Sequence, residues 1–141
     1  MSPSVFVVDT NVVSELTRQT PESRVLAFLA GHDNLWLSTV VLHELDFGVG
    51  LLPPGRRRDG IRAVLSAFAT EYEDRILPVG RSEARQAAAL RARAHGSGRV
   101  MDPGDAFIAG TAIANDLSVA TRNVRDFDGL GLGVIDPWRP L

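Results

Sequence analysis

Residues 5–16 have the sequence VFVVDTNVVSEL, and this stretch decides the fold. Residues 5–8 are all apolar, and the run ends abruptly at Asp9. A short, uninterrupted apolar run is typical of a strand that is buried on both faces, as in a parallel sheet covered by helices. From about Asn11 to Leu16 the pattern changes to that of helical turns. We therefore predict a buried strand with an aspartate at its carboxyl end.

The same alternation of strands and helices continues along the chain. Four further strands are predicted over residues 35–37, 76–78, 118–121 and 133–135, and helices over residues 20–31, 40–52, 59–72, 82–95 and 102–115. Thr20 and Asp59 are expected to cap two of these helices. Connections between parallel strands are right-handed and place helices on both faces of the sheet. We therefore predict an α/β fold, a three-layer sandwich with a mostly parallel central sheet of about five strands flanked by helices.

Composition narrows the class of protein. The chain has 141 residues, a formal net charge of −2 and no cysteine, which suits a single domain over residues 1–141 and excludes disulfide scaffolds and thiolate zinc sites. No segment reaches the ~20 apolar residues of a membrane span, and residues 1–4 lack the features of a secretory signal, so we expect a cytoplasmic protein that does not contact a membrane. The net charge, taken alone, argues against a protein that binds nucleic acid through bulk positive potential.

Carboxylates from distant parts of the sequence are predicted to meet at one edge of the sheet. Asp9 follows the first strand, Glu44 lies in the second turn of the helix after the second strand, and Asp105 lies in the first turn of the helix before the fourth strand. Asn123 and Asp126 follow the fourth strand. Ligands of open α/β sheets bind at the carboxyl ends of the strands. We therefore expect at least three carboxylates at this rim.

Two of these aspartates also have a purely structural explanation. Asp9 could cap the helical turns that follow it. Asp102 could cap the helix over residues 102–115, with Asp105 favouring the positive end of the helix dipole. However, Asp105 shares a helical stripe with the apolar residues around Ile108, so its side chain is expected to point inward.

Glu44 lies in a row of apolar residues at helical spacing, formed with Val40, Phe47 and Leu51. We expect this row to face inward, where a carboxylate is costly to bury without a cation, a hydrogen-bond partner or a shared proton. A lone inward glutamate is more often a satisfied structural residue than a ligand. The predicted proximity of the two aspartates favours a ligand here.

A divalent cation would neutralise carboxylates that otherwise repel one another. Oxygen ligands without cysteine or paired histidines favour Mg²⁺ or Mn²⁺ over zinc. His43 is adjacent to Glu44 but is expected to turn away from it, onto the surface. A metal held by a few carboxylates and several waters is typical of sites that act on phosphate oxygens.

Taken together, these motifs resemble the PIN-domain ribonucleases, and in particular the VapC-type toxins of bacterial toxin–antitoxin pairs. The resemblance rests on residues 8–15 (VDTNVVSE), 44–45 (EL), 105–109 (DAFIA) and 120–123 (ATRN), and it covers essentially the whole chain. It implies a PIN-like fold and Mg²⁺-dependent hydrolysis of RNA phosphodiester bonds, with Mn²⁺ as the alternative metal. It also implies a homodimer, a cognate VapB-type antitoxin that covers the active-site groove, and a higher toxin–antitoxin assembly.

Carried over position by position, the resemblance implies that Asp9, Glu44 and Asp105 are catalytic and hold the metal. Thr10 matches a hydroxyl residue beside the metal, and Asn11 matches a residue that orders the pocket.

The sequence departs from the family pattern at the fourth acid. Asn123 occupies a position that often carries aspartate, so either an amide fills this corner or Asp126 reaches it. The departure leaves open whether one or two metal ions bind. Thr121, at the end of the same strand, is expected to support the pocket through its hydroxyl.

All 15 basic residues are arginines. Arg122 and Arg125 border the predicted rim and are the candidates for contacts with RNA phosphates, whereas residues 56–58 are expected to be a solvated loop. Apolar positions in residues 40–52 and 61–68 could contact protein partners or belong to the core. A competing function is a catalytically inactive PIN-like module that only binds a partner protein.

Overall fold

The computed structural model describes residues 5–140 of the chain. Its strands are β1 (Phe6–Val8), β2 (Leu35–Ser38), β3 (Ile76–Leu77), β4 (Ser118–Ala120) and β5 (Val134–Ile135). Its α-helices are α1 (Thr10–Ser14), α2 (Ser23–Gly31), α3 (Thr39–Gly50), α4 (Arg56–Glu71), α5 (Arg81–Gly96), α6 (Pro103–Ala114) and α7 (Val124–Phe127). Short 3-10 turns follow α1 (Glu15–Thr17) and α4 (Glu73–Arg75). The prediction that residues 1–4 lack a secretory signal concerns residues outside the described part of the chain.

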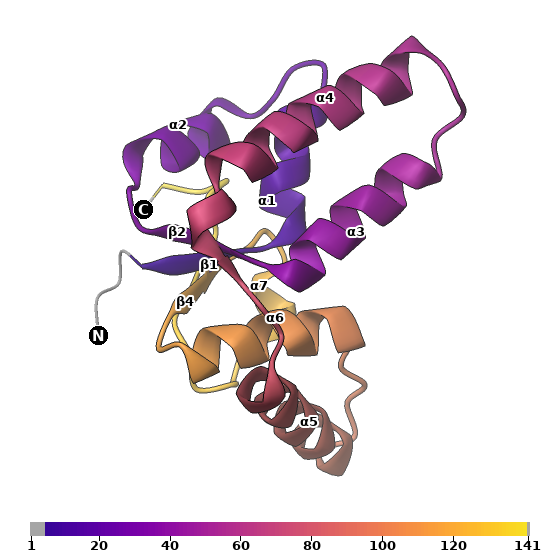
Figure 1. Ribbon diagram of the computed structural model, residues 1–141. Helices are drawn as coiled ribbons and strands as arrows, with labels where there is room; N and C mark the ends of the chain where they lie inside the picture. The colour runs from indigo at the N-terminus through magenta and orange to yellow at the C-terminus, as the bar shows by residue number, and fades with distance from the viewer. Residues whose placement is uncertain (1–4, 141) are drawn as a thin grey trace.

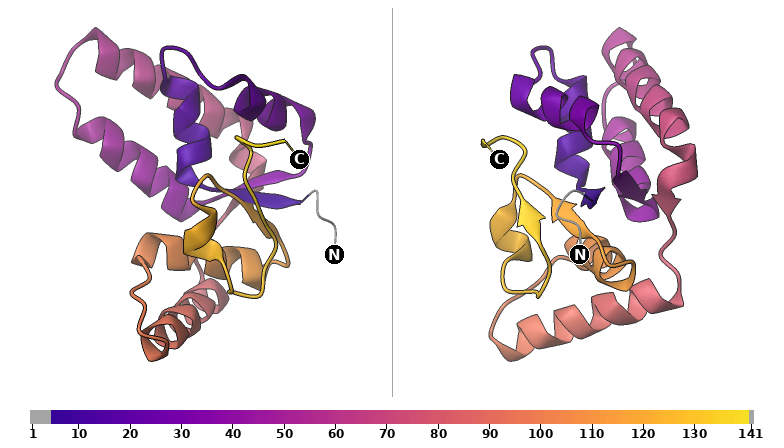
Figure 2. Two further views of the ribbon diagram at one scale, coloured as in Figure 1. Left: turned by 180° about the vertical axis from the view of Figure 1, so that it is seen from behind. Right: turned by 90° about the vertical axis from the view of Figure 1, so that its left-hand side faces the viewer.

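The five strands form one sheet in the order β3-β2-β1-β4-β5, and every pair of neighbours is parallel. Helices α1 to α4 lie on one face of this sheet, and α5 and α6 lie on the other (Figures 1 and 2). The predicted three-layer α/β sandwich is therefore confirmed. No helix in residues 5–140 is both long and apolar enough to cross a membrane.

Strand β1 lies at the centre of the sheet and of the core. Phe6, Val7 and Val8 are all buried, because helices cover both faces of the strand and neighbours pair with both of its edges. This placement accounts for an apolar run without alternation. Backbone pairing continues past the strand ends, where the Asp9 N–H donates to the Ala120 carbonyl at 2.9 Å and the Thr121 N–H to the Ile135 carbonyl at 2.9 Å. The residues that follow β1 and β4 are thereby held side by side at the carboxyl edge.

The predicted start of α2 was wrong. The helix begins at Ser23, and its cap is Glu22, whose side chain accepts from the Arg24 N–H, whereas Thr20 lies in the preceding bend. The cause is tertiary: the Glu22 N–H donates to the buried Glu15 carboxylate at 2.8 Å, which fixes the chain just before the helix.

The predicted start of α4 was also wrong. Arg56, Arg57 and Arg58 form its first turn and are not a loop, and Asp59 lies within that turn instead of capping it. Gly55, at φ 150°, ends the preceding Pro-Pro-Gly segment, and its carbonyl accepts from the Asp59 N–H.

The backbones of helices α5 and α6 are in close contact at Gly110. A Cβ on this residue would lie 2.7 Å from the Glu83 carbonyl oxygen and 2.8 Å from the Ala87 nitrogen, both of which are backbone atoms of α5. Backbone atoms cannot rotate away as a side chain can. The pairing of the outer helix with α6, and so the placement of the first turn of α6, depends on glycine at this position.

We predict that Gly110→Ala lowers the free energy of unfolding by roughly 1–3 kcal/mol, the usual cost of overpacking. Urea denaturation of the purified chain measures this change. Gly60→Ala in α4 is the matched control, since no atom lies within 4 Å of its Cβ position and alanine favours a helix by about 0.5–1 kcal/mol. Equal stability of the two variants would contradict the prediction.

Candidate active site

Asp9, at the end of β1, is the centre of the site. Its side chain is only 4% exposed and accepts three hydrogen bonds: from the Thr10 N–H at 2.7 Å, from the Thr121 hydroxyl at 2.7 Å and from Asn11 Nδ2 at 3.3 Å. Burial raises the pKa of Asp9, while the bonds from Thr121 and Thr10 act in the opposite direction. Asp9 caps α1, as one of the two sequence hypotheses held. It is also a buried carboxylate whose charged form is disfavoured by burial and by the charges of Glu44 and Asp126.

Asn11 and Thr121 join the ends of β1 and β4. Asn11 Nδ2 also donates to the Thr121 hydroxyl oxygen at 3.4 Å, and Asn11 Oδ1 accepts from the Arg122 N–H at 3.3 Å. The Asn123 N–H donates to the same Thr121 oxygen at 3.0 Å. The hydroxyl proton of Thr121 is therefore directed at Asp9, because its oxygen already accepts from its other neighbours. Both residues therefore orient the Asp9 carboxylate.

Glu44 reaches the site from α3. Its Oε1 accepts from the Thr10 hydroxyl at 2.6 Å, which links α3 to the first residue of α1. A Cβ on Gly104 would lie only 2.8 Å from Glu44 Oε2, so the Glu44 carboxylate is packed against the first turn of α6. The absence of a side chain at Gly104 permits this approach. Glu44 thus lies between the two helices that carry Thr10 and Asp105.

Asp105 lies in the first turn of α6, where the Asp102 side chain caps the helix by accepting from the Asp105 N–H at 3.3 Å. Asp105 is half-buried on the same face as the buried residue Ile108, as its helical stripe predicted. Burial, followed by the negative charges of Asp9, Asp126 and other neighbours, raises the pKa of Asp105 to about 7. This shift shows that the acids act on one another across one rim.

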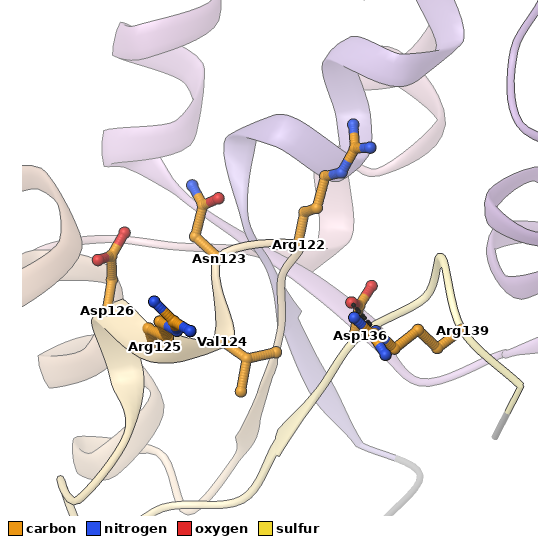
Figure 3. A pocket seen from close by; sticks show the side chains of 7 residues that line it. All are labelled: Arg122, Asn123, Val124, Arg125, Asp126, Asp136 and Arg139. Carbon is orange, nitrogen blue, oxygen red and sulfur yellow. Dashed lines mark ion pairs between the residues drawn. The ribbon is translucent and has the colours of Figure 1, made fainter.

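The turn after β4 carries Asn123 and Asp126, both with exposed side chains. Figure 3 shows the two side chains on the same side of the ribbon. The charge of Asp126 contributes to the raised pKa of both Asp9 and Asp105, which places it within electrostatic reach of them. Asn123 brings no charge to the rim.

The acids form an open rim instead of a closed cage. Within residues 5–140, no three His, Asp or Glu side chains lie close enough together to form a ready-made set of metal ligands. Mg²⁺ keeps several of its waters and commonly binds through one or two carboxylates. The residues present fit such an ion, because Asp9 and Asp105 present carboxylate oxygens, and a bound cation would favour their charged forms, which burial and mutual repulsion disfavour in its absence.

The expectation that the row containing Glu44 faces inward was wrong. Phe47 is 61% exposed and Leu51 is 69% exposed, whereas Val41, Leu45 and Val49 form the buried face of α3. Glu44 is half-buried at the boundary between these two faces. Periodicity identified an apolar row but not the face that packs on the sheet. Since Glu44 is only half-buried, hydration of its exposed part lowers the cost of its charge.

A hollow of about 750 Å³ lies beside this exposed row, lined by residues of α3 and α6 that include Glu44 and Phe107. His43 lines it as well, with its ring stacked on Phe47 at 6.5 Å between centroids. His43 is exposed as predicted, and it lines the same hollow as Glu44. Of the apolar positions that could be core or contact surface, Phe47, Leu51 and Val64 are exposed, whereas Leu65 and Phe68 are core.

A second hollow, of about 580 Å³, adjoins the rim on the side of the turn after β4. It is lined by Arg122 and Arg125, as their position in the sequence suggested, and also by Asp136 and Arg139 near the carboxyl terminus (Figure 3). Sequence reasoning missed the last two residues. Their position depends on the pairing of β5 with β4, for which no spacing in the sequence gives a signal.

Comparison with known proteins shows the family of this chain. Residues 6–131 match the model of the PIN domain. The chain belongs to the PIN-domain family. Among curated relatives, this PIN domain is 38% identical to VapC ribonuclease Y4jK of Sinorhizobium fredii, over 96% of this chain and 99% of that protein. It is 33% identical to toxin FitB of Neisseria gonorrhoeae, over 95% of this chain and 99% of that protein.

A solved structure of FitAB bound to an IR36 DNA fragment has the same PIN fold. Its TM-score with this chain is 0.88 at 30% sequence identity, and the match covers 97% of this chain and 98% of that one. The matched family segment of this PIN domain contains Asp9, Glu44, Asp105 and Asp126 and ends before β5.

The raised pKa of Asp105 predicts how stability depends on pH. Between about pH 4 and pH 7 the folded chain keeps a proton that the unfolded chain has lost, so the free energy of unfolding decreases as pH rises through this range. Asp9 acts in the same direction. Asp105→Asn stays neutral and should weaken this decrease.

Thermal or urea unfolding from pH 4 to pH 8, in the presence of a chelator, measures the slope for both chains. The Asp105→Asn variant should gain stability relative to the parent chain as pH rises. Parallel stability curves for the two proteins would rule out a proton on Asp105 as the cause.

Proposed function

We propose that this chain is a Mg²⁺-dependent endoribonuclease, a VapC-type toxin that hydrolyses RNA phosphodiester bonds at the carboxylate rim and is inhibited by a cognate antitoxin. The observation that carries the proposal is the buried carboxylate of Asp9, whose pKa is raised and which lies within electrostatic reach of Glu44 and Asp126. Membership of the PIN family and likeness to a protein named VapC ribonuclease support it.

Asp9, Asp105 and Glu44 are the residues that would hold the metal, one or two of them directly and the rest through its waters, with Mn²⁺ as the alternative to Mg²⁺. When bound, such an ion polarises a phosphodiester oxygen and supplies a water of lowered pKa. We assign the fourth corner of the site to Asp126, because its charge acts on both aspartates, whereas Asn123 offers only an amide. Whether one or two metal ions bind depends on whether Asp126 acts as a ligand.

The chain's other residues hold these acids in place. Thr121 and Asn11 orient the Asp9 carboxylate, and Thr10 orients that of Glu44. Attack of water on phosphorus, in line with the leaving 3′-oxygen, breaks the P–O3′ bond and leaves a 5′-phosphate and a 3′-hydroxyl. Hydrogen bonds made before the substrate arrives reduce the reorganisation that the reaction requires.

The proposed protein partners are a second copy of the chain and a VapB-type antitoxin, joined in a higher assembly. The exposed apolar side chains of Phe47, Leu51 and Val64, on α3 and α4, provide a surface for such contacts. The likeness of this chain to the structure of FitAB supports a paired arrangement.

The competing function is an inactive PIN-like module that only binds a partner protein. Asn123 favours this alternative because it replaces an acid with an amide. The gathering of several acids within electrostatic reach of Asp9 and Asp105 opposes it, since mutually repelling carboxylates cost stability and a module that only binds protein does not need them. RNA cleavage that stops on addition of a chelator and resumes with excess Mg²⁺ distinguishes the two.

We predict that Asp9→Asn or Asp105→Asn reduces cleavage by at least about a hundredfold while the fold survives, since each removes a metal-binding charge from the rim. Cleavage of total RNA by purified protein, followed by sequencing of the new 5′ ends, measures the loss. Circular dichroism and thermal unfolding confirm folding. Activity equal to that of the parent chain in either variant would overturn the site assignment.

Arg122 and Arg125 provide a separate prediction about RNA binding. Replacing both with alanine should weaken binding and reduce the slope of log affinity against log salt by about 1.4, since each phosphate contact on single strands contributes about 0.7. Fluorescence anisotropy with an unstructured RNA at several salt concentrations measures the slope. An unchanged slope would show that neither arginine contacts a phosphate.

A further inference from the structure

The hollow beside the turn after β4 includes the residues of that turn which face the carboxylate rim. Asn123 and Asp126, on the rim, also line it, and so do three arginines, Arg122, Arg125 and Arg139 (Figure 3). With its two aspartates, Asp126 and Asp136, this wall carries a formal excess of one positive charge. An RNA strand that is bound at the rim can extend along this arginine-lined wall.

Asp136 builds the far wall of the hollow. Its Oδ1 accepts from the Trp138 N–H at 2.8 Å, and its carbonyl accepts from the Arg139 N–H at 3.1 Å, so residues 136–139 form a turn. Its Oδ2 pairs with Arg139 Nε at 3.4 Å. The Asp136 side chain is 15% exposed, but that of Arg139 is 81% exposed. Asp136 is thus a fixed anchor, whereas the guanidinium lies in water.

Trp138 connects this turn to Arg122. The Arg122 guanidinium lies over the Trp138 ring, 5.0 Å from its centroid. The Arg122 N–H donates to Asn11, so Arg122 is held at both its backbone and its side chain. The backbone carbonyl of Trp138 accepts a hydrogen bond from the guanidinium of Arg24, on α2, at 3.4 Å. This bond helps to hold Trp138 in place. A cation that is held in place loses less entropy when it binds a phosphate.

We propose that residues 136–139, here named the C-terminal turn, form the second wall of a track for the RNA backbone. Arg139 is a third phosphate-binding residue beside Arg122 and Arg125, and Trp138 is a positioning residue for Arg122. In the free protein Arg139 pairs with Asp136, and when RNA binds a phosphate replaces Asp136 as the partner of Arg139. The inference deepens the proposed function and rests on it for the identity of the ligand.

The energetics favour this exchange of partners. An exposed ion pair contributes about 0–1 kcal/mol, so little is lost when Arg139 leaves Asp136. Arginine binds phosphate through two parallel N–H groups, with a stronger and more directional contact. The exchange also predicts that Asp136 competes with RNA, so removal of its charge should strengthen binding while removal of Arg139 weakens it.

The test measures binding of a fluorescein-labelled, unstructured 20-nucleotide RNA by anisotropy, in Mg²⁺, with Asp9→Asn as the parent chain to suppress cleavage. Arg139→Ala should weaken binding about tenfold at low salt and reduce the salt slope by about 0.7. Asp136→Asn keeps the oxygen that accepts from Trp138 and should tighten binding about two- to fivefold. Arg85→Ala, on α5 at the opposite face of the sheet, is the matched control and should leave the slope unchanged.

The role of Trp138 is tested in the same assay. Trp138→Leu should weaken binding as much as Arg122→Ala does, the two together should weaken it no further, and Trp138→Phe should restore most of the affinity because its ring still supports the cation. Additive losses, or a Phe variant as weak as the Leu variant, would overturn the positioning role. Thermal unfolding of each variant shows whether it folds.

The inference and the proposed function fail separately. Metal-dependent cleavage together with unchanged RNA binding in Arg139→Ala and Asp136→Asn would overturn the inference and leave the function standing. Opposite shifts in these two variants, in a protein without cleavage, would support the track and overturn the nuclease. Shifts in binding of a polyglutamate peptide, without shifts for RNA, would make the hollow a protein-binding surface and overturn the inference.

Discussion

The hydrogen bond from the Thr121 hydroxyl to the Asp9 carboxylate is the interaction on which the site depends. It joins the ends of β1 and β4 inside the protein, where an unpaired charge would be very costly. Bonds from Thr10 and Asn11 add to it, yet the pKa of Asp9 stays raised, so the folded chain retains a carboxylate that is not fully satisfied. A proton or a bound cation would relieve this cost.

The parallel sheet makes this arrangement geometrically simple. Because every strand runs in one direction, the residues after β1, β2 and β4 emerge at one edge, and each enters a turn or helix that points its first side chains back toward the same rim. Asp105 arrives from the opposite direction, at the start of α6, whose placement depends on close packing at Gly110. The apolar core thus fixes where charge accumulates.

Sequence reasoning succeeded where a side chain's position follows from its own strand. It placed Asp9 and Thr121 together because they end strands that were identifiable from apolar runs, and the structure joins them at 2.7 Å. It failed for the row containing Glu44, since periodicity defines a face without showing what packs against it. It missed Arg139, whose place depends on the pairing of β5 with β4 and on a turn built by Asp136. Long-range packing decided each of these failures.

The net charge of −2 is a sum over the whole chain and hides the difference between a negatively charged region and a positively charged one. Asp9, Glu44 and Asp105 concentrate negative charge at the rim, while Arg122 and Arg139 line the adjoining hollow. Screening in physiological salt limits electrostatic reach to about 8 Å, so a phosphate responds to the groups beside it and not to the sum. Total charge therefore excludes a protein that coats nucleic acid through bulk potential, but it leaves room for one that binds an RNA strand along a single arginine-lined wall.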